Sequence, residues 1–142
     1  MKTKDILNLD YRKEENKKII QKVLRKIKPL SKFSDENDIP LQAIERVIKI
    51  LTNKYEIIPK QMMMSYYETD LGIYSIEIRK NINSYEHIGT VYGMCVYEVF
   101  AKLAIKMYSE VKLGNIPERV LTKEEKQRER IAKKIDKTKG EY

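Results

Sequence analysis

The chain has 142 residues, of which 42% are hydrophobic and 35% charged, and its formal net charge is +8. This length corresponds to one domain of roughly 100–200 residues. With 5 Gly, 4 Pro and one cysteine, Cys95, the composition excludes collagen, low-complexity disorder and a disulfide scaffold. No apolar run is long enough to span a membrane, and the first residues lack the apolar stretch of a secretory signal. We therefore expect a soluble, cytoplasmic protein without a membrane partner.

Basic residues are concentrated at the two ends of the chain. Residues 1–32 carry eleven Lys or Arg against four Asp or Glu, residues 33–111 carry eight against eleven, and residues 112–142 carry ten against six. We predict a basic N-terminal arm and helix (1–32), an αβββα globular core (33–113), and a basic, partly helical, mobile tail (114–142). Basic arms suit a polyanion, because Lys and Arg displace counterions from phosphates, but they also serve as a solvated surface.

The first predicted helix spans residues 15–28. Its apolar residues form one stripe at about 100° per residue, and we expect this stripe to pack on the core: Ile19, Ile20, Val23, Leu24 and Ile27. The opposite side carries four cations that we expect to face outward as candidate nucleic-acid contacts: Lys18, Lys22, Arg25 and Lys26. Candidate contacts in the tail are Arg128, Arg130, Lys133 and Lys134.

A loop over residues 28–38 precedes the second predicted helix, which has Asp38 near its N-cap and Pro40 in its first turn. The helix continues to about Tyr55. Aliphatic residues recur on one face at intervals of three and four, which is typical of a core helix: Leu41, Ile44, Val47, Ile48 and Leu51.

Beyond Pro59 the hydrophobic period changes to two. This pattern predicts strands over residues 61–68, 73–80 and 85–93, joined by short turns. In the second strand, Tyr74, Ile76 and Ile78 alternate with polar residues, as in a half-buried antiparallel sheet. Gly89 and Gly93 in the third strand indicate a bulge or close packing by a helix.

From Cys95 the period returns to that of a helix, which ends near Lys112. We expect a core stripe of Val96, Val99, Phe100, Leu103, Met107 and Val111, and an exposed charged side of Glu98, Lys102, Lys106 and Glu110. Cys95 is expected to be a small buried residue. A capping-box pattern at Thr122 starts the tail, which has few apolar residues with which to pack.

Together these elements predict an α+β fold in which helices pack on one face of a three-stranded antiparallel sheet, in the order α-α-β-β-β-α. Residues 40–112 resemble double-stranded RNA-binding domains in topology and size, through the stretch from Tyr74 to Gly93 and the helix that follows. That family has lysines at the start of this helix, where the present chain has residues 95–98, Cys-Val-Tyr-Glu. The resemblance therefore implies a shared fold without a transferable RNA-binding residue.

Few residues suit catalysis or metal binding. His87 is the only histidine, which excludes sites built on a pair of histidines, and Cys95 has no Cys or His near it in sequence. Asp70 at a turn, with Glu77 and Arg79 on the next strand, approaches the pattern with which many nucleases hold Mg²⁺, although arginine cannot act as a base. We expect a protein that is not an enzyme and needs no cofactor or metal. A metal-dependent nuclease is the weaker alternative.

Five of the ten tyrosines lie in the predicted strands: Tyr66, Tyr67, Tyr74, Tyr85 and Tyr92. Tyrosines on an open sheet contact proteins, stack on bases, or lie half-buried as favoured strand residues. We take Tyr66, Tyr67 and Tyr85 as the candidate protein interface.

The composition, rich in Lys, Ile, Asn and Tyr, and residues 88–102 resemble small orphan proteins of phages and mobile elements from AT-rich bacteria. This resemblance implies a non-enzymatic accessory role in the cytoplasm of a bacterial host. Our hypothesis is a protein that binds nucleic acid or a nucleoprotein through its basic arms. The alternative is a protein-binding inhibitor of a host enzyme or defence system, anti-CRISPR-like or another anti-defence protein, that uses the tyrosine-rich sheet.

Overall fold

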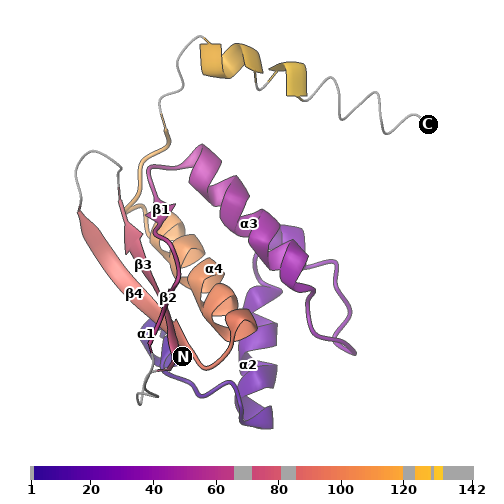
Figure 1. The fold of residues 1–142 in the computed structure, drawn as a ribbon. Coiled ribbons are helices and arrows are strands. Elements are labelled where there is room, and N and C mark those ends of the chain that lie inside the picture. Colours follow the sequence, from indigo (N-terminus) through magenta and orange to yellow (C-terminus); the bar gives the residue numbers. More distant parts are fainter. Residues whose placement is uncertain (1, 66–71, 81–85, 120–123, 129, 133–142) are drawn as a thin grey trace.

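A computed structural model describes residues 2–65, 72–80, 86–119, 124–128 and 130–132. Its named helices and strands, in chain order, are α1 (Thr3–Leu7), α2 (Glu14–Leu24), the 3-10 helix η1 (Lys28–Leu30), α3 (Leu41–Lys54), β1 (Ile58–Pro59), β2 (Met63–Met64), β3 (Tyr74–Arg79), β4 (His87–Gly93) and α4 (Val96–Lys112). Figure 1 shows helices packed against one antiparallel sheet, which confirms the predicted α+β class.

The sheet is organised around β3. Strand β4 pairs with one side of β3, and the short strands β1 and β2 pair with the other side, all antiparallel. The prediction of one continuous first strand over residues 61–68 was therefore wrong. This edge of the sheet consists of two short strands, β1 and β2, and β1 lies before Gln61. Pro59 has no N–H to donate and ends β1, while the next residue, Lys60, still donates its backbone N–H to the carbonyl of Glu77 at 2.8 Å.

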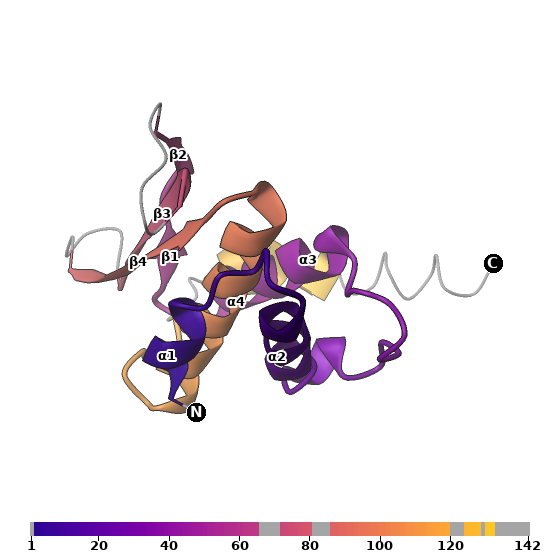
Figure 2. The same cartoon turned by 90° about the horizontal axis from the view of Figure 1, so that it is seen from below.

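Alternation along β3 gives the sheet one buried and one open face. Ile76 and Ile78 are buried, and Glu77 between them lies on the opposite face. Figure 2 shows the helices on one side of the sheet. The prediction for the two glycines of β4 is also confirmed: the register shifts where Ile78 faces Gly89, and helix α4 approaches the backbone of Gly93 closely.

Helix α4 is the central element of the fold. It packs against β3 and β4 and also against α1, α2 and α3 (Figure 2), so it is enclosed from several directions. Its buried residues accordingly run almost without interruption from residue 98 to residue 107. The prediction that Glu98 and Lys102 lie on an exposed side was wrong, since both are buried, and Lys106 and Glu110 are half-buried.

The N-terminal helices share this core. Ile20 and Leu24 of α2 are fully buried, as the apolar stripe predicted, and Ile6 of α1 is buried against the same cluster. Helix α1 was not predicted. Helix α2 ends at Leu24 rather than at residue 28, because Pro29 has no N–H for a helical bond and disfavours a helical conformation at the residue before it.

Helix α3 begins one residue after Pro40, which is itself the N-cap. Asp38 lies two residues before the N-cap, near it as predicted, but the placement of Pro40 inside the first turn was wrong. The backbone of Ile39 explains the late start, since its N–H is bonded to the side chain of Gln21 and its carbonyl to the hydroxyl of Tyr97. The predicted core face of α3 is confirmed, with Ile44, Val47, Ile48 and Leu51 buried.

After α4 the chain returns to the body before the tail. Ile116 is buried, Glu118 forms an isolated bridge with Tyr55, and Arg119 donates its backbone N–H to the carbonyl of Lys54 at 2.9 Å. Residues 124–128 and 130–132 are helical. None of the helices within the described ranges is both long and apolar enough to cross a membrane.

Candidate functional site

Three lysines form a cationic row along the outer side of α2 and its C-terminal end. Lys18, Lys22 and Lys26, called here the basic row, are all exposed, while the opposite side of the helix is buried. Within the part of the chain that the structure describes, none of the three ammonium groups forms an ion pair with a carboxylate. The prediction that these lysines face outward is confirmed.

Arg25 was predicted to belong to the same outward set, and this was wrong. Only 13% of its side chain is exposed. Its guanidinium donates hydrogen bonds to three backbone carbonyls of the loop that follows η1 and pairs with one carboxylate: Phe33 at 3.3 Å, Ser34 at 2.7 Å, Asn37 at 2.6 Å and Asp35 at 3.4 Å. Arg25 therefore holds residues 33–37 against α2 and is a structural residue.

Replacing Arg25 with alanine is expected to release this loop. We expect a loss of about 1–3 kcal/mol in the free energy of unfolding, because three hydrogen bonds from a charged donor to backbone carbonyls are removed. Hydrogen–deuterium exchange should quicken at residues 33–37 and stay unchanged in β3. The matched control is Lys22→Ala, one turn earlier on the exposed side, and an equal effect of both changes would contradict this role.

The loop that Arg25 holds gives the basic row an acidic border. A hollow of about 530 Å³ lies between α2 and the loop, lined on one side by Lys17, Lys18 and Lys22 and on the other by acidic residues that include Glu36 and Asp38. A polyanion must therefore approach the row from the side away from the loop, because the carboxylates repel it on the other side.

The two predicted groups of cations do not meet. Arg128 and Arg130 are exposed in the helical tail, and Figure 1 shows α2 at one end of the helices and the tail beyond the other end. Lys133 and Lys134 lie outside the described residues. The predicted protein-interface tyrosines, Tyr66, Tyr67 and Tyr85, also lie outside them.

A buried amide organises the contact between α2, α4 and the start of α3. The side-chain nitrogen of Gln21 donates to the hydroxyls of Tyr11 at 3.0 Å and Tyr97 at 2.8 Å, and its oxygen accepts from the N–H of Ile39 at 2.9 Å. The two tyrosine rings lie 5.6 Å apart. This network fixes α2, and with it the basic row, on the core.

The hydroxyl groups of Tyr11 and Tyr97 are expected to make the free energy of unfolding depend on pH in the alkaline range. Burial raises the pKa of the Tyr11 hydroxyl far above its ordinary value of 10.0, and burial also raises the pKa of Tyr97. The unfolded chain therefore loses these protons at lower pH than the folded chain does, so the free energy of unfolding should fall as pH rises above about 10. Urea titrations between pH 8 and 11 test this, with Tyr97→Phe as the comparison. An equally steep decline in that variant would contradict the assignment.

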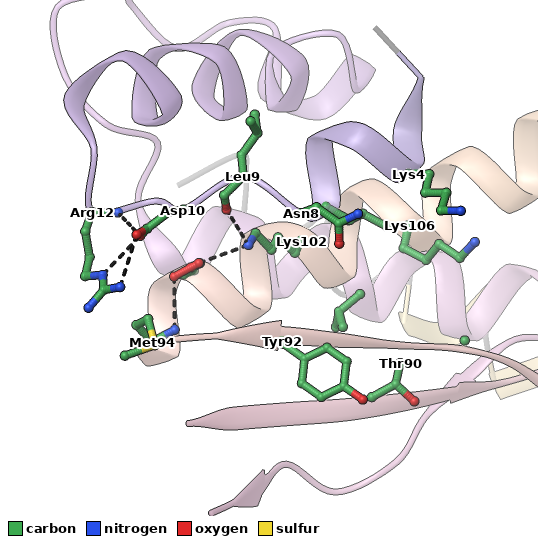
Figure 3. Close-up of a pocket in the computed structure, with 14 residues that line it drawn as sticks. Lys4, Asn8, Leu9, Asp10, Arg12, Thr90, Tyr92, Met94, Lys102 and Lys106 are labelled. Carbon is green, nitrogen blue, oxygen red and sulfur yellow. Dashed lines mark hydrogen bonds and ion pairs between the residues drawn. The ribbon is translucent and has the colours of Figure 1, made fainter. Parts of the chain in front are cut away.

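A groove runs beside β4, between this strand and the N-terminal segment (Figure 3). Its walls are residues 89–92 of β4 and residues between Lys4 and Arg12, and the α4 side chains Glu98, Lys102 and Lys106 also line it. The cavity measures about 380 Å³. We call it the β4 groove.

A buried ion pair lies in this groove. The ammonium group of Lys102 donates to Glu98 Oε2 at 3.0 Å and to the backbone carbonyl of Leu9 at 2.7 Å, and Glu98 Oε1 accepts from the N–H of Met94 at 3.0 Å. These bonds explain how two charged side chains are buried on α4, because each charge is paired and hydrogen-bonded. They also join the N-terminal segment to the start of α4.

Glu77, one residue of the nuclease alternative, lies on the open face of the sheet. Asp70 lies outside the described residues. Glu77 lies among basic groups, with Arg79 at 3.2 Å, Lys60 at 3.8 Å and His87 at 3.9 Å, surroundings that disfavour a divalent cation. Among the residues with described positions, no group of three or more His, Cys, Asp or Glu side chains could hold a metal ion.

Cys95 caps α4 instead of filling the core. Its side chain is exposed and accepts a hydrogen bond from the N–H of Glu98 at 3.4 Å, so the predicted burial was wrong. The reason is its N-cap position, where the backbone is extended and the side chain turns back towards the first helical turn.

Comparisons with protein-family models, with curated proteins and with solved structures found no match. The resemblances to double-stranded RNA-binding domains and to small phage proteins therefore stay predictions.

Proposed function

We propose that this chain is a non-enzymatic protein that binds the phosphate backbone of nucleic acid through the basic row. The observation that supports this proposal is that Lys18 and Lys22 on the outer side of α2 are exposed together with Lys26, which lies just beyond the C-terminal end of that helix. Lysines without an intramolecular partner are free to neutralise phosphates. Binding then releases the counterions that are condensed on the nucleic acid, and this release increases the entropy of the solution. The phage-like composition would make it an accessory protein acting on host nucleic acid or a nucleoprotein.

The packing of α2 supports a preorganised surface. Lys18 and Lys22 are one turn apart, about 6 Å along a helix of 1.5 Å rise per residue. The helix itself is anchored by the fully buried Ile20 and Leu24 and by the Gln21 network. The tail cations Arg128 and Arg130 would then be a second, separate contact on a long polyanion.

Salt dependence tests this proposal. Binding to fluorescein-labelled duplex and single-stranded DNA and RNA is measured by anisotropy over a range of salt concentrations. Because each neutralised duplex phosphate contributes about −0.9 to the slope of log K against log salt, we expect a slope of about −2 to −4. The double change Lys18→Glu/Lys22→Glu should make the slope shallower by about 2 and weaken binding at low salt.

The matched control is Arg46→Glu/Lys49→Glu. These two residues are exposed on a different helix, α3, and the change alters the net charge by the same amount. If both double variants weaken binding equally, the effect comes from net charge alone and the proposed surface is wrong. Absence of binding to all four nucleic acids at low salt would also contradict the proposal.

The inhibitor hypothesis stays as the alternative because of an exposed edge of the sheet. Met63 and Met64 on the edge strand are 65% and 60% exposed, and methionine-rich surfaces adapt to protein partners. A contact centred there should depend weakly on salt, unlike binding to phosphates.

A further inference from the structure

We propose that the β4 groove binds an extended, acidic segment of a partner protein, which adds to the sheet as a strand beside β4. This inference goes beyond the proposed nucleic-acid surface and is independent of it, because the groove lies on β4 and α4 rather than on the outer side of α2. Three features of the groove favour such an occupant: the unpaired edge of β4, the shape of the groove and its charge.

The edge of β4 is available for pairing. Among the described strands, β4 pairs with β3 alone, so its other edge has no neighbouring strand. An edge strand presents unpaired backbone N–H and C=O groups, which natural proteins usually cover. Here the N-terminal segment packs instead on α4, through the bond from Lys102 to the carbonyl of Leu9 and the bond between the hydroxyls of Thr3 and Ser109 at 3.0 Å.

The lining of the groove shows that it reaches this edge. Four consecutive residues of β4, from Gly89 to Tyr92, line it. Because successive side chains point to opposite faces of a sheet, a cavity on one face alone would contact alternate residues only. The groove therefore runs along the edge over four residues, about 13 Å at 3.3 Å per residue, which is enough to pair with a short strand.

The charge of the groove selects an acidic occupant. Four basic residues line it against two acidic ones: Lys4, Arg12, Lys102 and Lys106 against Asp10 and Glu98. Three of the four are already paired, Arg12 with Asp10, Lys102 with Glu98, and Lys106 with Glu110 outside the groove, so the charge available to an occupant comes mainly from Lys4. Lys4 is exposed and has no ion pair within the described ranges, and the Lys102 ammonium, with three N–H groups, uses two in its bonds to Glu98 and Leu9. Carboxylates at alternate positions of an added strand would face these donors.

Peptide arrays provide the probe. The intact protein is incubated with short synthetic peptides in which Glu alternates with Val, Ile, Thr or Tyr, and with the same peptides carrying Lys in place of Glu. We expect binding to acidic members only. For the best binder, N-methylation of alternate amides on one edge should abolish binding, and N-methylation on the other edge should not, because only one edge pairs with β4. Hydrogen–deuterium exchange should slow at residues 89–92.

Two charge reversals separate the groove from net charge. Lys4→Glu should weaken binding of that peptide about tenfold, because it places a like charge beside the occupant. Lys2→Glu, an exposed lysine outside the groove, should change it by less than about twofold.

Four results would overturn the proposal: no binding by the acidic array, equal loss with both reversals, equal loss with both methylation patterns, or protection on α2 alone. If inorganic phosphate displaces the peptide as readily as unlabelled peptide does, the groove is a pocket for small anions instead. If duplex DNA displaces the peptide and Lys4→Glu weakens binding of that DNA, the groove is part of a nucleic-acid surface instead. The Lys18→Glu/Lys22→Glu variant should bind the peptide normally, which keeps this test distinct from the proposed function.

Discussion

Replacing Gly93 with alanine should destabilise the protein by about 3 kcal/mol or more, through overpacking against backbone atoms. A Cβ at this position would lie 2.6 Å from the backbone nitrogen of Val99 and 3.1 Å from the carbonyl oxygen of Cys95. Backbone atoms at the start of α4 cannot move aside without shifting the helix. The added methyl group would therefore separate α4 from β4 and loosen the whole core.

Urea denaturation followed by circular dichroism measures this effect. Gly89→Ala is the matched control on the same strand, since its Cβ would meet only the Lys106 side chain, at 3.4 Å from Cε. That flexible side chain can give way, and replacing a strand glycine removes an entropic cost, so stability should stay within about 1 kcal/mol of the parent. Equal stabilities of the two variants would contradict the close approach of α4 to β4.

The second large effect is expected at the buried ion pair. Lys102→Met leaves the carboxylate of Glu98 buried with only the N–H of Met94 as a partner, since Lys102 and Glu98 are both almost fully buried. Removing one member of a buried pair costs about 3–5 kcal/mol, because the remaining charge is uncompensated. The N-terminal segment should also detach, because the Leu9 carbonyl loses its donor.

A double-mutant cycle tests the origin of this cost. Glu98→Gln/Lys102→Met keeps an acceptor for the Met94 N–H and removes both charges, so most of the lost stability should return. We expect a coupling energy of about 2 kcal/mol or more between the two positions. If the double variant is as unstable as the sum of the single changes, the charges do not compensate each other and the account of this pair is wrong.

The periodicity of apolar residues correctly predicted which face of an element is buried where that element packs on one side only. The apolar stripe of α3 and the alternation of β3 are both confirmed, because each element buries one side only. The outward lysines of α2 follow from the same argument. The burial of Arg25 could not be predicted in this way. Its partners belong to the loop of residues 33–37, and no periodic pattern in the sequence indicates that this loop folds back onto α2.

The burial of α4 depends on contacts that are distant in sequence. Lys102 is held by Leu9, a separation of 93 residues, and an i,i+4 Glu–Lys pair is more often a solvated one. One signal was available: residues 99–105 are apolar except for Lys102, and a helix that is hydrophobic on all sides is enclosed. The β4 groove could not be predicted, because it needs the placement of α1, which was missed.

The most direct test of the central claim is an NMR titration of the labelled protein with duplex DNA at low salt. The account predicts chemical-shift changes centred on residues 18–26, with residues 89–92 of β4 unaffected and the changes reversed by added salt. Changes confined to the sheet, or shifts on α2 that persist at high salt, would contradict binding of phosphates by the basic row.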